Sequence, residues 1–307
     1  MKALTKITFT DDNGIKFFGE GPCRLLCLVE ETGSLRAAAK EMEMAYSKAS
    51  KILKQAEISL GFPLTTRSAG GKDGGGSVLT EEGKQFLKRY QDYRDACIRA
   101  NEQLYREMFP ITGCVIMASG MGKRFGSNKL MADFLGEPLI CRAFAATEGL
   151  FDKRVVVTRH EEIAGLCRQR DIPFVLHDLP YRSDTVRLGL EALGDVQACL
   201  FCPGDQPLLK IETVAALLGH WRENREQICR PIAAEAPGAP VLFPQWAFSE
   251  LKDLPQGKGG GYILARHPEK VSCLPVENPL ELTDADTPET LSRLLCEVPK
   301  NNLNDPE

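Results

Sequence analysis

Apolar and polar residues first alternate and then recur with a helical period in the opening third of the chain. Residues 4–19 alternate around Asn13-Gly14, and an Asn-Gly pair between two β-prone runs predicts a β-hairpin. Apolar residues then recur every three to four positions. This period predicts helices from about Pro22 to Gly33, from Leu35 to Met42 and from Tyr46 to Leu60.

A glycine-rich stretch and a long helix complete this part of the chain. Five of the seven residues 70–76 are Gly, which neither a helix nor a strand interior tolerates. Because apolar residues flank the stretch, we expect it to form the tip of a β wing. Thr80 then caps a helix that runs to about Met108 and could pair two chains. The order of elements predicts a winged helix-turn-helix domain.

Charge is unevenly distributed between the two parts of the chain. Residues 1–110 hold 17 Lys+Arg and 15 Asp+Glu, whereas the remainder holds 21 and 27. Within 34–72, seven basic residues stand against three acidic ones, which suits contact with a phosphate backbone; a solvated helix face is the alternative. The residues expected to contact DNA are Tyr46, Ser47, Lys48, Lys51, Lys54, Arg67 and Lys72.

After Pro110 the pattern changes to short apolar runs that alternate with helical segments. The run 113–118 predicts a buried parallel strand. Further strands are expected at 155–157, 174–176 and 198–201, and helices at 161–170 and 185–193. This rhythm predicts an α/β domain, Rossmann-like, with a mostly parallel sheet and helices on both faces.

A glycine-rich turn follows the first of these strands. Gly120, Gly122 and Gly126 would let the backbone turn its N–H groups toward an anion. Arg124 and Lys129 would add positive charge that matches a triphosphate. The spacing is neither that of a P-loop nor that of the dinucleotide fingerprint, so a different nucleotide-binding loop is predicted.

The strand at 198–201 is followed by Gly204-Asp205-Gln206-Pro207. Ligands of parallel sheets bind at the carboxyl ends of the strands, so Asp205 is placed to hold Mg²⁺ beside a triphosphate. A turn or a helix cap is the alternative role for Asp205. Cys199 and Cys202 have the spacing of a redox or zinc pair, but they lie on a predicted buried strand, where packing is expected.

Composition narrows the class of protein. The chain has 307 residues, of which 43% are hydrophobic and 26% charged, as in ordinary globular proteins. No stretch approaches the ~18–20 apolar residues of a membrane helix, and we see no signal peptide at the N-terminus, so a cytoplasmic protein with no membrane partner is expected. Eleven scattered Cys favour buried thiols over a disulfide framework.

Several residues of the first part match a known regulator. They are Gly33-Ser34, Ala37-Ala38-Ala39, Met44, Tyr46, Lys48 and the glycine-rich wing before Leu79-Thr80. With these residues, nearly all of 5–90 resembles the DNA-binding domain of the bacterial molybdate-responsive regulator. That family usually has Ser at position 45 and Trp at position 50, where this chain has Ala45 and Ser50, so its operator sequence does not carry over. Its molybdate-binding domain has no counterpart here.

The second part carries a further resemblance. The segments that match are 118–129, 136–140 and 204–208, with support from 238–243, 257–261 and 282–289. Over about 112–295 the chain resembles the Rossmann-like nucleotidyltransferase superfamily, nearest to the molybdenum cofactor cytidylyltransferases and their guanylyltransferase relatives. Asn128-Lys129-Leu130, Gly204-Asp205-Gln206-Pro207 and Arg182-Ser183-Asp184-Thr185-Val186 favour the cytidylyl branch. Ser119 departs from that family's Ala or Gly.

The resemblance implies an activity and roles for individual residues. The implied reaction is Mg²⁺-dependent transfer of CMP from CTP to the phosphate of a molybdopterin-type acceptor, with release of pyrophosphate. Arg124, Lys129 and Asp205 would be catalytic, and Lys258 would bind the acceptor. Asp284 or Asp286 would join Asp205 at the metal, although Asp286-Thr287-Pro288 equally fits a helix N-cap followed by Pro. The nucleotide-binding residues would be Ala118, Ser119, Gly120, Met121, Gly122, Lys129, Arg182 and Thr185.

Two domains are therefore expected, a DNA-binding domain at 1–109 and a transferase domain at 110–298, followed by a flexible tail at 299–307. A homodimer is expected through the long helix. Three alternatives stay open. The winged-helix domain could serve dimerisation only. The chain could be a transcription regulator whose second domain binds nucleotide or cofactor without turnover, or a transferase of the same family that uses GTP, as a guanylyltransferase, or a different phosphorylated acceptor.

Overall fold

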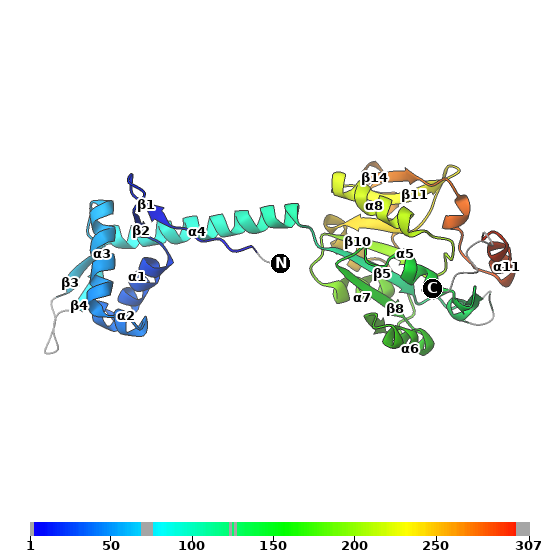
Figure 1. Ribbon diagram of the computed structural model, residues 1–307, viewed down its shortest axis with the longest axis horizontal. Helices are drawn as coiled ribbons and strands as arrows, with labels where there is room; N and C mark the ends of the chain where they lie inside the picture. The colour runs from blue at the N-terminus through cyan, green and yellow to red at the C-terminus, as the bar shows by residue number, and fades with distance from the viewer. Residues whose placement is uncertain (1–2, 69–75, 123–124, 126–127, 299–307) are drawn as a thin grey trace, which may run out of the picture. The chain divides into compact units, whose positions relative to one another are not determined.

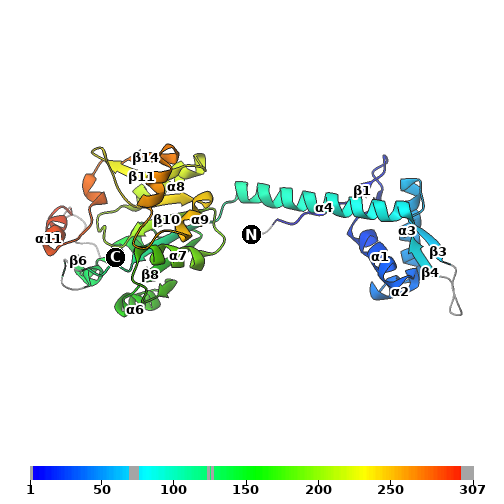
Figure 2. The same cartoon turned by 180° about the vertical axis from the view of Figure 1, so that it is seen from behind.

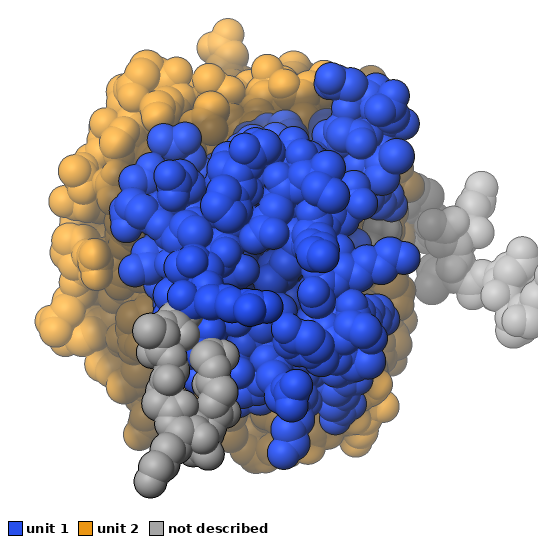
Figure 3. Space-filling view, turned by 90° about the vertical axis from the view of Figure 1, so that its left-hand side faces the viewer, with its two compact units in different colours: residues 1–109 blue, residues 110–307 orange. Residues whose placement is uncertain are grey.

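The computed structural model describes residues 3–68, 76–122, 125 and 128–298. The chain divides into two compact units, Met1–Phe109 and Pro110–Glu307, which Figure 3 distinguishes by colour. Among the described residues, no helix combines the length and the apolar character that crossing a membrane requires.

The first unit is a small helical domain with two β-hairpins (Figure 1). Its elements are β1 (Phe9–Thr10), β2 (Lys16–Phe18), α1 (Glu20–Thr32), α2 (Leu35–Glu41), α3 (Tyr46–Leu60), β3 (Thr65–Ser68), β4 (Gly76–Leu79) and α4 (Glu81–Met108). The strands pair antiparallel within each hairpin. The elements follow the predicted order. The tip of the predicted wing, with Lys72, lies outside the described residues.

Local signals in the sequence set the ends of these helices. Gly33 ends α1 in the left-handed conformation, at φ 66°. The Ser34 side chain then accepts a hydrogen bond from the Ala37 N–H and begins α2. Thr80 does the same for α4, because its Oγ1 accepts from the Gly83 N–H at 2.9 Å. These caps hold the helices around a core in which Phe18 packs edge-on against Phe86 and Tyr90.

The second unit is built on one eight-stranded sheet. Its strand order is β12-β11-β13-β10-β5-β8-β9, with β14 paired to β11. The strands are β5 (Thr112–Ala118), β8 (Lys153–Thr158), β9 (Phe174–Leu176), β10 (Ala198–Pro203), β11 (Ile228–Ala233), β12 (Ala236–Pro237), β13 (Val241–Pro244) and β14 (Val271–Pro275). Strands β10, β5, β8 and β9 run parallel, and β13 is antiparallel to its neighbours. A separate hairpin joins β6 (Asp133–Phe134) and β7 (Glu137–Pro138).

Helices cover both faces of this sheet (Figures 1 and 2). They are α5 (Ile140–Ala146), α6 (Glu161–Gln169), α7 (Arg182–Leu193), α8 (Ile211–Glu223), α9 (Phe248–Lys252), α10 (Gly261–Arg266) and α11 (Pro288–Cys296). One core lies between the sheet and α5, α6, α8 and α11, and the other between the sheet and α7, α9 and α10. The α/β fold with a mostly parallel sheet and an N-terminal helix-turn-helix is therefore confirmed.

Two cysteines of β10 show that this strand is buried on both faces of the sheet. Cys199 belongs to the core under α7, and Cys202 to the core on the opposite face. Both side chains are fully buried. Burial raises the pKa of the Cys202 thiol to about 12. Because the two thiols face opposite sides of the sheet, they pack as apolar groups and do not form a redox or zinc pair.

Candidate active site

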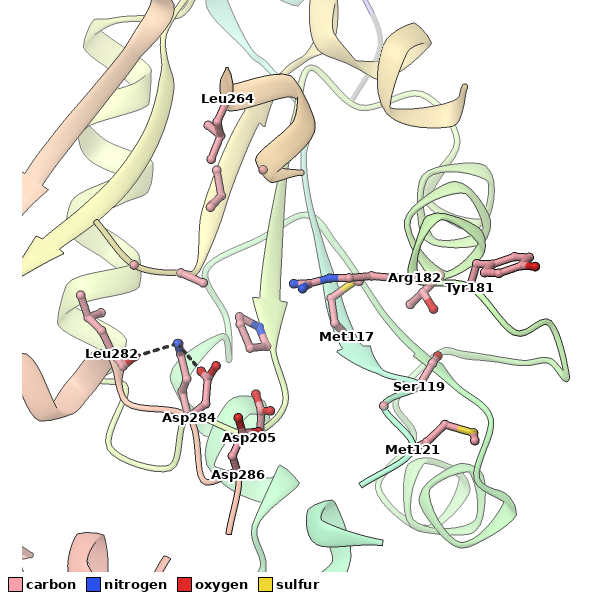
Figure 4. Close-up of a pocket in the computed structure, with 18 of the residues that line it drawn as sticks. Met117, Ser119, Met121, Tyr181, Arg182, Asp205, Leu264, Leu282, Asp284 and Asp286 are labelled. Atoms are coloured by element: carbon pink, nitrogen blue, oxygen red, sulfur yellow. Dashed lines mark hydrogen bonds between the residues drawn. The ribbon is translucent and has the colours of Figure 1, made fainter. Parts of the chain in front are cut away.

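A pocket of about 1130 Å³ opens at the carboxyl ends of the parallel strands. Its walls include Ser119 to Met121 after β5, Arg159 after β8, and Asp205 and Gln206 after β10. The first turn of α7 adds Arg182 and Thr185. Figure 4 shows three aspartates gathered on one side, Ser119 and Met121 on the other, and Arg182 reaching in between. This is the edge at which ligands bind in α/β sheets.

Lys129 is the centre of the aspartate cluster. Its Nζ donates to Asp205 Oδ2 at 2.5 Å and to Asp286 Oδ1 at 2.7 Å. The lysine is only 8% exposed and begins a 3₁₀ turn at 129–131. Burial pulls its pKa down, but the charges and hydrogen bonds of the two aspartates outweigh burial, so the pKa of Lys129 is raised. The ammonium stays charged and holds two chain segments together.

A second set of bonds ties the segment after β10 to the segment before α11. Gln206 Nε2 donates to Asp284 Oδ1 at 3.0 Å and to the Leu282 carbonyl at 3.2 Å (Figure 4). The Ala285 N–H donates to the Asp205 carbonyl at 2.8 Å. Burial, and next the charge of Asp205, raise the pKa of the Asp284 carboxyl. The aspartate side of the pocket is therefore held in place by its own hydrogen bonds.

The segment after β5 is fixed by a histidine. The Leu179 N–H donates to His177 Nδ1 at 3.2 Å, so the other ring nitrogen carries the proton when the ring is neutral. His177 Nε2 then donates to Ser119 Oγ at 2.8 Å, and Ser119 Oγ lies 3.1 Å from the Val157 carbonyl, to which it donates. Burial lowers the pKa of His177, which favours this neutral form.

Some of the predicted site residues line the pocket and others do not. Ser119, Gly120, Met121, Arg182, Thr185, Asp205 and Asp286 line the pocket. Ala118 is fully buried and Lys258 is exposed, and the pocket wall includes neither of them, nor Gly122 or Lys129. Arg124 and Gly126 lie outside the described residues. Thr287, one residue beyond Asp286, caps α11 by accepting from the Thr290 N–H, with Pro288 in its first turn.

Sequence reasoning missed several residues of the site. They are Arg159, His177, Gln206 and Arg230, of which all but His177 line the pocket. Gln206 stood inside a segment already chosen for Asp205, so its amide could have been considered there. His177 and Arg159 follow expected strands and carried a positional signal. Arg230 lies within a strand that was not expected, and no motif surrounds it.

The first unit carries the residues expected to contact DNA. Tyr46, Ser47, Lys48, Lys51 and Lys54 all belong to α3, and each is exposed. Arg67 is exposed on β3. The Arg36 guanidinium lies 5.6 Å from the centre of the Tyr46 ring. Burial of Ala49, Leu53 and Ala56 on the inner side of α3 leaves its lysines facing solvent.

Comparison with known proteins assigns the first unit to a class of fold. Residues 23–84 match the helix-turn-helix of bacterial regulatory proteins of the lysR family. Over 85 residues the chain is 34% identical to the molybdenum transport protein ModE of Azotobacter vinelandii, covering 26% of this chain and 32% of that protein. The resemblance to a molybdate-responsive regulator is therefore confirmed for this unit.

The second unit has relatives of a different kind. Over 114 residues it is 26% identical to the "Probable molybdenum cofactor guanylyltransferase" of Aquifex aeolicus, covering 37% of this chain and 55% of that protein. The chain thus spans between about a third and just over half the length of these two curated relatives.

Solved structures show the same fold. Rv0371c of Mycobacterium tuberculosis superposes with a TM-score of 0.55 at 22% identity, over 62% of this chain and all of that one. A structure of Rv0371c in complex with manganese superposes with a TM-score of 0.51, again at 22% identity, over 62% of this chain and all of that one.

The longest match covers most of the sheet and most of the pocket wall, and it ends before Leu282, Asp284 and Asp286. Residues 114–271, a little over half of the chain, match the MobA-like NTP transferase domain. The chain belongs to the MobA-like NTP transferase family, with a bacterial regulatory helix-turn-helix preceding the transferase domain.

Proposed function

We propose that the protein is a nucleotidyltransferase in which the transferase domain is joined to a DNA-binding module. The observation that carries the proposal is that Asp205 and Asp286, on the wall of a large pocket, meet at the buried Lys129. Family membership supports the same chemistry.

The reaction is a displacement at phosphorus. A phosphate oxygen of the acceptor forms a bond to the α-phosphorus of the nucleoside triphosphate. The bond from that phosphorus to the β-phosphate oxygen breaks, and its electron pair leaves with pyrophosphate. The residues of the chain position the two anions and offset their charge, and no covalent enzyme intermediate is needed.

Two described residues supply positive charge: Arg182 on the pocket wall, and Lys129, which is buried and paired with Asp205 and Asp286. The Lys129 ammonium is charged and already balances two carboxylates. Arg182 lies at the start of α7, with its guanidinium directed into the pocket (Figure 4). The neutral His177 holds Ser119, which orients the backbone that would face the triphosphate. Arg124 is proposed to act with them.

The residues present fit a divalent cation. Asp205 and Asp286 bring two carboxylates together on the pocket wall, each with one oxygen 2.5–2.7 Å from Lys129 Nζ. Among the described residues there is no cluster of three or more His, Cys, Asp or Glu suited to a metal. Mg²⁺ commonly takes one or two carboxylates and completes its shell with phosphate oxygens and water. Asp205 and Asp286 would hold the ion, which would offset charge developing on the phosphates.

We propose CTP as the nucleotide and a molybdopterin-type phosphate as the acceptor. The residues 128–130, 182–186 and 204–207 support CTP. The Aquifex relative, which is named a guanylyltransferase, makes GTP the competing nucleotide. The ModE relative of the first unit and the Aquifex relative of the second both concern molybdenum, which supports an acceptor of this class.

The proposal is tested by measuring pyrophosphate release with Mg²⁺ and molybdopterin, with CTP and GTP supplied separately. The wild-type chain is expected to release pyrophosphate with CTP. Asp205→Asn should lower kcat/KM at least 100-fold, because it removes one charge from the pair at Lys129. Asp195→Asn makes the same change on an exposed residue outside the pocket wall and should have no effect.

The outcomes separate the candidate functions. Release with GTP alone would replace CTP by GTP. Release that Asp205→Asn leaves unchanged would contradict the assignment of the site. No release with either nucleotide, although both bind, would favour the alternative in which the second unit is a nucleotide or cofactor sensor for the DNA-binding module.

A further inference from the structure

We infer that Arg230 recognises an anionic group of the acceptor, in a subsite at the β11 end of the pocket. This inference rests on the proposed function, because it gives the acceptor a place within the proposed active site. Arg230 belongs to β11 and lines the pocket, yet no sequence motif contains it.

The position of Arg230 separates it from the segment that follows β5. In the sheet, β11 is followed by β13, then β10, then β5. Neighbouring strands lie ~4.8 Å apart, so β11 is about 14 Å from β5. The aspartate cluster after β10 lies between them. A nucleotide held at the β5 end therefore leaves the β11 end for the second substrate, which must reach the α-phosphorus from the opposite side for an in-line displacement.

The register directs Arg230 to the same face of the sheet as Arg182. Ile228, two residues earlier on β11, packs into the core under α7, α9 and α10. Side chains two apart on a strand share a face, so Arg230 lies on that face. Leu264 and Ala265 of α10 border the pocket there.

The guanidinium is held at one edge and open at the other. Nε and Nη2 both donate to the Gly238 carbonyl, at 3.1 and 2.8 Å. Arg230 makes no ion pair with any carboxylate that the structure describes. The opposite edge, formed by Nη1 and Nη2, matches the two oxygens of a phosphate or carboxylate.

Its surroundings explain why such a group would be bound tightly. Arg230 is half-buried, and burial lowers the pKa of its guanidinium below the ordinary value, because the cation is poorly solvated. A half-buried cation without a carboxylate partner is costly, and an anionic ligand would offset that cost.

The size and lining of the pocket agree with a second ligand. About 1130 Å³ exceeds the ~300–1,000 Å³ of a usual single-ligand pocket. The same pocket wall carries the apolar side chains of Ala239, Val241, Leu264 and Leu282. An acceptor with a flat, largely uncharged body and an anionic group fits this combination of one cation and an apolar wall.

The inference is tested with Arg230→Gln and Arg230→Lys in the full chain. We measure the KM for molybdopterin and for CTP, and separately titrate molybdopterin without nucleotide to obtain its Kd. Arg230→Gln should raise KM and Kd for molybdopterin roughly 10- to 100-fold and leave the KM for CTP within about 2-fold. Arg230→Lys keeps the positive charge but loses the planar guanidinium. Its KM and Kd for molybdopterin should lie between those of the wild type and those of Arg230→Gln. Arg222→Gln on the exposed end of α8 is the matched control, and thermal unfolding checks that each variant is folded.

The KM and Kd values of the Arg230 variants either support the inference or overturn it. An increase in the KM for CTP as large as that for molybdopterin would overturn the inference, since Arg230 would then serve the nucleotide. An unchanged Kd for molybdopterin in Arg230→Gln would overturn it as well, and so would a wild-type chain that does not bind molybdopterin. A wild-type chain that binds molybdopterin but releases no pyrophosphate would contradict the proposed function alone, and the Kd of the Arg230 variants would still test the subsite.

Discussion

His177 is a titratable residue that holds Ser119, one of the residues of the pocket wall. Its ring is surrounded by charged side chains of both signs, namely Arg159, Arg187, Asp178 and Asp184. Burial is nonetheless the largest influence and lowers its pKa below the ordinary 6.5. Protonation would place a hydrogen on Nδ1, which now accepts from the Leu179 N–H. The folded state therefore disfavours the imidazolium.

The expected consequence is a loss of stability in acid. Because the unfolded chain binds the proton first, the stabilisation from His177 is complete above pH 6.5 and is lost as the pH falls from there through the lower pKa of the folded state. His177→Gln, which does not titrate, should be about 1 kcal/mol less stable than the wild type at pH 7.5. Thermal unfolding should show this gap narrowing at pH 5.5. A gap that is the same at both pH values would contradict the prediction.

Some residues of the site could be predicted from the sequence, and others could not. Asp205 and Lys129 belong to short motifs with glycine and proline neighbours, so their importance was predictable. The ion pairs of Lys129 could not be predicted, because its partners Asp205 and Asp286 are 76 and 157 positions away in the sequence. Arg230 donates to the Gly238 carbonyl, which directly follows β12, and its place on the pocket wall follows only from the order of strands in the sheet.

At the scale of elements, α3 carries the expected DNA contacts on its solvent side. Lys48 and Lys51 are both exposed and one helical turn apart. Replacing both by Ala should weaken DNA binding and reduce the slope of log K against log salt by about 0.9 for each DNA phosphate that the variant no longer neutralises. Fluorescence anisotropy with labelled duplex DNA measures both quantities.

The matched control is Lys252→Ala, an exposed lysine at the end of α9 in the other unit. It should leave the affinity and the salt slope as they are. Equal binding by the double variant and the wild type would show that α3 does not face DNA.

The first turn of α4 depends on Gly83, where Ala would ordinarily favour a helix. A Cβ at Gly83 would overlap the carbonyl oxygen of Leu64, just before β3. Gly83→Ala should therefore destabilise the fold by about 1–3 kcal/mol. Gly219→Ala, within α8, meets no neighbour within 4 Å and should stabilise it by up to ~1 kcal/mol. Thermal unfolding of the two variants compares them, and a stabilised Gly83→Ala would contradict the packing described.

The order of elements was predictable where periodicity and caps agree. The helix Tyr46–Leu60 and the strand Phe174–Leu176 coincide with their predicted limits. Helix α7 begins at Arg182, three residues before the expected Thr185, because the Asp184 carboxylate accepts from the Tyr181 N–H and supports an extra turn. Strand β13, antiparallel in a largely parallel sheet, gave no periodic signal in its four residues.

At the scale of the molecule, we propose that the long helix α4 pairs with α4 of a second copy. Tyr93, Leu104 and Met108 are 53%, 58% and 73% exposed and share one side of α4, at spacings of eleven and four residues. The proposed homodimer would cover them. Leu104→Glu should convert dimers to monomers in sedimentation velocity, whereas Gln103→Glu, one residue away, should not. A monomeric wild type would contradict the proposal.

The central claim is that the second unit transfers a nucleotide to a phosphorylated acceptor. The most direct test is mass spectrometry of the product formed when the full chain is incubated with Mg²⁺, molybdopterin and equal concentrations of CTP and GTP. We predict a molybdopterin–cytidine adduct that is absent in Asp205→Asn. The absence of any nucleotide adduct, with both nucleotides recovered intact, would contradict the claim.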